Sequence, residues 1–130
     1  MLLEDFIHQS LNNSNYNEVF TIPLSDEVLQ KISDLSGVNV KKYIFIIEAH
    51  SIRHIKNRHS EDLYLLDKIV DILQSFDRVQ KSLTRNAQTG KTDISIVFEK
   101  RLGDGTVKMV ALRIVRYKYL SLKTFFRKDM

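Results

Sequence analysis

The chain has 130 residues, 43% of them hydrophobic and 28% charged, which is typical of one globular domain and predicts a single domain over residues 1–130. It contains no cysteine, which excludes disulfides, thiolate nucleophiles and thiolate metal ligands. No segment is apolar enough for a membrane span, and the acidic start of the chain is unlike a secretory signal, so we expect a cytoplasmic protein without membrane contact.

The net charge of +4 is unevenly distributed along the chain. Residues 1–80 carry 8 Lys and Arg against 12 Asp and Glu, whereas residues 81–130 carry 12 Lys and Arg against 4 Asp and Glu. A basic half is typical of a protein that contacts nucleic acid, but it is equally typical of strands with ordinary exposed lysines. Composition alone does not decide between these two interpretations.

The first half of the chain predicts helices separated by two short strands. Apolar residues at helical spacing indicate helices over residues 2–12 and 25–36. β-Branched and aromatic residues indicate strands over residues 18–22 and 43–47. A histidine-rich helix follows the second strand directly, and a further helix is expected over residues 60–75.

Beyond Asp77 the apolar pattern changes to period two, which is typical of strands. We expect a hairpin turn at residues 103–105 and strands over residues 79–83, 94–99, 110–115 and 120–126. Because helices come first and an antiparallel meander comes last, the sequence predicts an α+β fold. In that fold, N-terminal helices pack on a C-terminal antiparallel sheet of about four strands.

Strict alternation in the last strand divides its side chains between two faces. One face is expected to carry Tyr119, Ser121, Lys123 and Phe125, and the other Leu120, Leu122, Thr124 and Phe126. Thr124 is then a polar residue on an apolar face. Such a residue is either a hydrogen-bonded core hydroxyl or part of a site between helix and sheet.

Three of the four histidines lie between His50 and His59, with Arg53 and Arg58 among them. Imidazole titrates near neutral pH, and guanidinium binds phosphate through two donors, so the segment predicts a site that binds a phosphodiester and moves a proton. On a helix His50, His54 and Arg58 share one stripe, while His59 falls at the edge of the buried stripe. His54 and His59 can share a site only if the helix ends near Arg58. His50 itself is expected to be a partly exposed helix residue. The alternative for the whole segment is a solvated basic helix without chemistry.

A metal site in the same helix is not expected. His50 and His54 have the spacing that lets two imidazoles share a zinc ion. Ser51 stands where a zinc protease motif has its glutamate, no third ligand is evident, and the nearby arginines repel a cation. We therefore predict neither a catalytic metal nor any other cofactor.

Three short motifs follow one another in an informative order. They are His54-Ile55 with Arg58-His59, then Phe76-Asp77-Arg78-Val79, and finally Leu120-Ser121-Leu122-Lys123-Thr124-Phe125-Phe126. Their order and spacing resemble the phage-encoded branch of the barnase–EndoU–colicin–RelE nuclease superfamily. The resemblance covers residues 43–127. Residues 1–42 fall outside it, as a structural elaboration or a surface for a partner.

This resemblance implies a metal-independent endoribonuclease of phage or toxin type, with helices against a four-stranded antiparallel, barnase-like sheet. By this resemblance, His54 and His59 are expected to be the acid–base groups and Arg58 a phosphate ligand. Lys123 and Thr124 are expected to position or stabilise the reacting phosphate. Arg53 and Arg113 are further candidates for binding RNA. Its expected partners are RNA, with tRNA as one candidate, and an immunity or antitoxin protein. The alternative on the same fold is a non-catalytic RNA- or protein-binding module, or a phage structural or assembly protein.

Overall fold

The computed structural model describes residues 1–129, and its side chains through Lys128. The chain forms α1 (Leu3–Asn12), β1 (Val19–Ile22), α2 (Asp26–Ser36), β2 (Ile44–Glu48), α3 (Ala49–Arg58), the 3₁₀ helix η1 (Ser60–Lys68), α4 (Ile69–Ser75), β3 (Arg78–Arg85), β4 (Thr92–Leu102), β5 (Gly105–Ile114) and β6 (Tyr119–Asp129). The predicted α+β class is confirmed. The helix expected over residues 60–75 begins as a 3₁₀ helix and becomes α-helical only at Ile69.

The six strands form one mixed sheet in the order β1-β2-β6-β5-β4-β3. All neighbouring strands are antiparallel except β2 and β6, which are parallel. The expected sheet of about four antiparallel strands is therefore only the C-terminal meander, and the expectation that the helices all precede the sheet is wrong. The two early strands join the meander because β2 satisfies backbone groups of β6 that would otherwise form an exposed edge.

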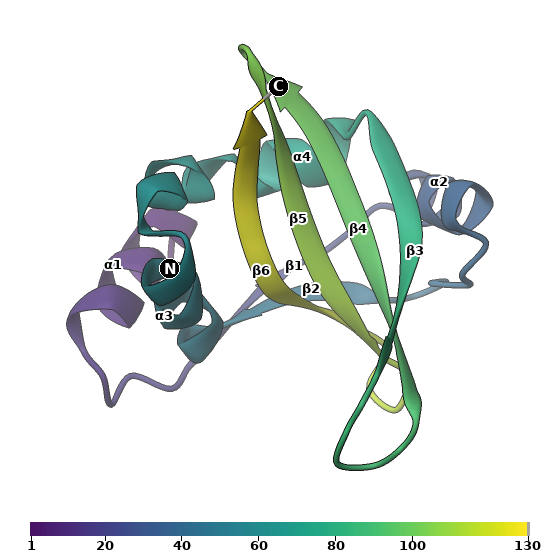
Figure 1. The fold of residues 1–130 in the computed structure, drawn as a ribbon, viewed down its shortest axis with the longest axis horizontal. Helices are drawn as coiled ribbons and strands as arrows, with labels where there is room; N and C mark the ends of the chain where they lie inside the picture. The colour runs from purple at the N-terminus through teal and green to yellow at the C-terminus, as the bar shows by residue number, and fades with distance from the viewer. Residues whose placement is uncertain (130) are drawn as a thin grey trace.

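Helices cover the sheet at both ends and across its middle (Figure 1). In that view α1 and α3 lie beside β6, α2 lies beside β3, and α4 lies behind the upper parts of β4 and β5. The core between these layers is large and apolar. Its largest fully buried side chains include Phe6, Phe45, Phe98, Phe125, Ile52 and Ile55. Within residues 1–129 no helix is both long and apolar enough to cross a membrane.

Local chemistry explains where the helices near the site begin and end. The Ser25 hydroxyl accepts a hydrogen bond from the Val28 N–H at 3.1 Å and so caps α2, which ends at Gly37 with a left-handed φ of 75°. Helix α3 ends at Arg58, and His59 leaves the helical conformation with φ −141° and ψ 51°. His59 therefore lies on a turn. The helical spacing of the sequence required such a helix end at Arg58 for His54 and His59 to share a site.

Strand β6 contains a bulge that breaks the predicted alternation. Val110 of β5 pairs with Thr124, but the next residue, Ala111, pairs with Leu122, so Lys123 is an extra residue in β6. Leu122 and Phe125 consequently both face the core, at 1% and 0% exposure. The predicted faces are correct as far as Leu122 and wrong beyond it, because Thr124 and Phe126 lie on the side away from the core.

Arg53 links α3 to the first helix. Its Nη1 donates to the backbone oxygens of Ser10 at 3.1 Å, Asn13 at 3.4 Å and Tyr16 at 3.1 Å. These carbonyls lie at the end of α1 and in the loop that follows it, where helical partners run out. A side chain expected to bind RNA phosphates thus holds the N-terminal segment against α3.

We predict that Arg53→Ala lowers the free energy of unfolding by about 2 kcal/mol, because the hydrogen bonds from a charged donor to three carbonyls are lost. The measurement is urea denaturation. Lys56→Ala on the exposed side of the same helix is the matched control and should change stability little. Equal stability of the two variants would contradict the structural role of Arg53.

Candidate active site

A groove of about 320 Å³ lies where the start of α3 meets β5 and β6. Its lining residues are Glu48, His50, Ser51, His54, Leu112, Ile114, Ser121, Leu122 and Lys123. The groove exists because α3 begins directly where β2 ends, while the parallel strand β6 continues past that point. The first turns of α3 therefore lie beside the middle of β6.

A carboxylate and an imidazole are paired at one end of this groove. Oε2 of Glu48 lies 3.3 Å from Nδ1 of His50, and Oε1 of Glu48 accepts a hydrogen bond from the Ser121 hydroxyl at 3.4 Å. The carboxylate favours a proton on Nδ1, which directs the other ring nitrogen of His50 away from Glu48. The His50 side chain is 63% exposed, so that nitrogen is accessible to a ligand.

His54 and Lys123 complete the polar lining of the groove. His54 is one helical turn beyond His50 on α3, and both are exposed. Lys123 is the extra residue of the bulge in β6, so its side chain lies outside the core and lines the groove. The groove thus offers two imidazoles, each a group that can donate or accept a proton, and an ammonium group that can neutralise an anion.

Neither His59 nor Thr124 lines the groove: His59 follows the end of α3, and Thr124 is the residue after Lys123 in β6. The His59 ring stacks on Phe126 with centroids 5.1 Å apart and planes 24° apart. Phe126 is three residues beyond Lys123, which is about 10 Å along a strand. Thr124 pairs with Val110 on the sheet face next to the groove. The structure therefore brings His54 together with Lys123 and His50, and separates His54 from His59.

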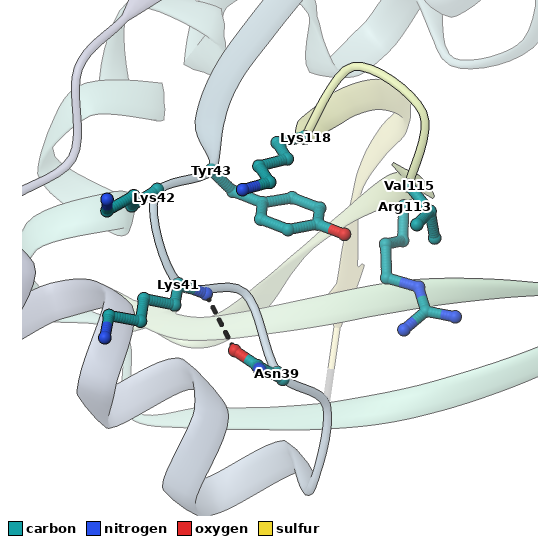
Figure 2. Close-up of a pocket in the computed structure, with 7 residues that line it drawn as sticks. All are labelled: Asn39, Lys41, Lys42, Tyr43, Arg113, Val115 and Lys118. Atoms are coloured by element: carbon teal, nitrogen blue, oxygen red, sulfur yellow. Dashed lines mark hydrogen bonds between the residues drawn. The ribbon is translucent and has the colours of Figure 1, made fainter.

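The three arginines expected at the site also lie elsewhere. Arg58 is exposed at the last residue of α3, and the guanidinium of Arg53 is bound to backbone carbonyls. Arg113 points away from the groove into a second pocket, which it shares with Lys118 and two other lysines (Figure 2). Successive side chains of a strand point to opposite faces of the sheet. Leu112 and Ile114 therefore line the groove, whereas Arg113 between them lines the second pocket.

An ion cluster around a buried carboxylate occupies the same sheet face nearer the β4–β5 hairpin. Glu99 is 9% exposed, and its oxygens lie 3.4 Å from Nζ of Lys108 and 3.7 Å from Nε of Arg78. Cations on both neighbouring strands therefore neutralise this carboxylate. None of the three residues lines the groove.

Within residues 1–129, the histidine and carboxylate groups placed to share a metal ion are His59, Glu61 and Asp62, all outside the groove. Asp62 is already engaged, since its Oδ2 accepts a hydrogen bond from the Arg127 backbone N–H at 3.0 Å. In the part of the chain that the structure describes, no such group of three includes a groove residue.

Sequence reasoning missed Glu48, Ser51 and Ser121, and it gave His50 no role. The helical stripe that joined His50 to His54 was the available signal for His50. Glu48 belongs to a strand, and Ser121 to a strand distant in sequence, so a helical pattern could not connect them to His50.

A family model described as phage-Barnase-EndoU-ColicinE5/D-RelE like nuclease3 matches residues 25–129 of the chain. The match begins at the cap of α2 and includes every element of the groove. It therefore extends farther toward the N-terminus than the resemblance seen in the sequence motifs, which began at residue 43. Neither a curated protein nor a solved structure matches the chain.

We predict that neutral His50 carries its proton on Nδ1, and that Glu48→Ala shifts its tautomer population toward the Nε2–H form. Long-range proton–nitrogen NMR correlations measure this population directly. His8 on the exposed face of α1 is the internal control and should not change. An unchanged His50 spectrum in Glu48→Ala would show that the carboxylate does not orient the imidazole.

Proposed function

The chain belongs to the phage-Barnase-EndoU-ColicinE5/D-RelE like nuclease family, and on this premise we propose that it is a metal-independent endoribonuclease. The proposed active site is the groove between α3 and β6. One observation carries the proposal: His50, His54 and Lys123 meet in that groove although they come from two elements far apart in the sequence.

RNA cleavage without a metal needs three chemical tasks, because RNA supplies its own nucleophile. A base removes the proton of the 2′-hydroxyl, and the 2′-oxygen forms a bond to phosphorus. The bond from phosphorus to the 5′-oxygen breaks as an acid protonates that oxygen. A cation stabilises the extra negative charge on the phosphoryl oxygens. The products are a 2′,3′-cyclic phosphate and a 5′-hydroxyl.

The groove contains a group for each task. Two imidazoles one helical turn apart have Cβ atoms about 5–6 Å from each other, a separation that allows them to flank one phosphate. We assign the proton transfers to His50 and His54, and stabilisation of the phosphoryl oxygens to Lys123. Glu48 acts through His50 as a positioning residue, since a carboxylate on Nδ1 fixes the orientation and tautomer of the ring.

This assignment revises the pair of histidines proposed from the motifs. His54 is common to both versions, but His50 replaces His59 as its partner because His50 shares the groove and His59 stacks on Phe126. Thr124, next to Lys123 in β6, is within one residue of the proposed phosphate site. RNA as the substrate, tRNA as one candidate, and an immunity protein as a partner are carried over as proposals from the same resemblance.

We predict that the purified protein cleaves labelled single-stranded RNA in the presence of EDTA, and that His54→Ala lowers the rate about 10²–10⁴-fold, the usual loss when an acid–base group is removed. His50→Ala should fall in the same range, and His59→Ala should lose less. The measurement is the rate of product formation on a gel, with the product ends identified by mass spectrometry.

His8→Ala is the matched control, because His8 is exposed on α1 and its ring hydrogen bonds with Asn12 of the same helix. An RNA with a single 2′-deoxynucleotide at the cleaved position should resist cleavage there. Loss of activity in EDTA would refute metal independence, and products with a 3′-hydroxyl would refute attack by the 2′-oxygen. Binding of RNA by wild type without cleavage would favour the non-catalytic alternative.

A further inference from the structure

A pocket of about 470 Å³ lies between the loop before β2 and the β5–β6 hairpin, outside the proposed active site. Its lining residues are Asn39, Lys41, Lys42, Tyr43, Arg113, Val115 and Lys118 (Figure 2). Four of them are cations and none is a carboxylate. Within residues 1–129 none of these four cations forms an ion pair. Cations gathered without counter-ions create a positive potential that attracts an anion.

Arg113 gives this pocket a more specific preference than charge alone. Its Nε is buried and has no hydrogen-bond partner in the described chain. A buried donor without an acceptor is unfavourable, and most such groups in proteins are satisfied. Figure 2 shows Arg113 and Lys118 on the β5–β6 hairpin and Lys41 and Lys42 on the loop before β2, with the Lys41 and Lys42 side chains extending away from Arg113 in this view. A phosphate oxygen would satisfy Nε, and the planar guanidinium matches phosphate geometry.

The backbone fixes the two lysines at the rim in an uncommon conformation. Lys42 and Lys118 have φ of 66° and 56°, and they are the non-glycine residues of the described chain with positive φ. The Ile44 N–H donates to the Lys118 oxygen at 3.1 Å and joins the two segments. Left-handed backbone at long side chains is uncommon and persists where the surrounding structure imposes it. The backbone at both lysines is therefore fixed close to the start of β2.

An aromatic pair, Tyr117 and Tyr119, lies on the same hairpin, on either side of Lys118 in the chain. The rings of Tyr117 and Tyr119 stack with centroids 5.7 Å apart and planes 27° apart, and Cζ of Arg116 lies 5.3 Å from the Tyr117 ring centre. Tyr119 pairs with Ile114, which lines the groove. Tyr117 is 58% exposed, so it offers a ring to solvent. Exposed aromatic rings beside cations are typical of surfaces that stack unpaired bases.

We propose that the β5–β6 hairpin binds the RNA strand next to the cleaved phosphate: an unpaired base stacks on Tyr117, and a neighbouring backbone phosphate occupies the cationic pocket around Arg113. This inference rests on the proposed ribonuclease function. Nucleic acid is favoured over a small anion because an exposed aromatic ring, Tyr117, lies on the same hairpin as Arg113 and Lys118 of the cationic pocket. Bases and phosphates alternate along one strand, so a bound strand can place a base on the ring and the next phosphate in the cationic pocket.

The test uses the full chain and a fluorescent RNA oligonucleotide with 2′-O-methyl groups throughout, which cannot be cleaved by attack of the 2′-oxygen. Fluorescence anisotropy gives Kd. The double variant Lys41→Gln/Lys118→Gln should raise Kd about tenfold and reduce the log–log slope of the salt dependence of binding by roughly 0.7, the value for one phosphate contact on a single strand. Tyr117→Ala should raise Kd about tenfold, while Tyr117→Phe should retain binding.

The matched control is Lys81→Gln/Lys91→Gln, which removes the same charge from exposed positions on β3 and the loop after it. Equal weakening by both double variants would overturn the proposal, since only net charge would then matter. Inorganic phosphate or a mononucleotide that binds the pocket as tightly as the oligonucleotide would also overturn it, in favour of a small-anion site. Retention of wild-type affinity by Tyr117→Ala would refute the stacked base.

The two proposals fail in different experiments. Binding here does not require cleavage, so a protein that binds through the pocket but cleaves no RNA would refute the ribonuclease alone. A protein that cleaves RNA but whose pocket variants bind like the control would refute the hairpin subsite alone.

Discussion

The parallel pairing of β2 with β6 is the constraint on which the candidate site depends. It matches Ile44 with Tyr119 and continues through Ser121, after which β2 turns into α3. From that point β6 has no strand on this side, and α3 and η1 cover it instead. Asp62 of η1 accepts the Arg127 backbone N–H and so satisfies part of the edge that β2 leaves open. The groove forms at the point along β6 where its neighbour changes from the strand β2 to the helix α3.

The bulge at Lys123 determines which side chains of β6 face solvent beside α3. Without it, Phe125 would face solvent and Thr124 would face the core. Burial of a phenylalanine side chain is worth about 1.5–3 kcal/mol, so the shift of register after Leu122 is favoured by packing alone. The same shift moves Thr124 and Phe126 to the outer face and leaves Lys123 unpaired beside α3. One extra residue therefore serves both the core and the groove.

The sequence predicted the parts of this arrangement that depend on local pattern. Helical spacing placed His50 and His54 on one stripe, and the motif order indicated that the helix would meet the last strand. It could not predict the bulge, because strict alternation and a single insertion differ only in tertiary packing. It could not predict that the Arg53 guanidinium would bind carbonyls of α1, or that Glu48 at a strand end would face His50. Those contacts join elements whose relative positions follow from the β2–β6 pairing.

The end of β5 also limits the kind of nucleic acid that fits both proposed sites. Leu112 and Ile114 face the groove, whereas Arg113 and Val115 face the cationic pocket, so the two sites lie on opposite sides of one strand. A polymer that occupies both must bend around the β5–β6 hairpin within a few nucleotides. Duplex nucleic acid resists such bending, since the persistence length of DNA is about 150 base pairs. An unpaired strand bends freely and exposes bases to Tyr117 as it does so. The geometry therefore favours a single-stranded segment or loop of RNA over a continuous helix.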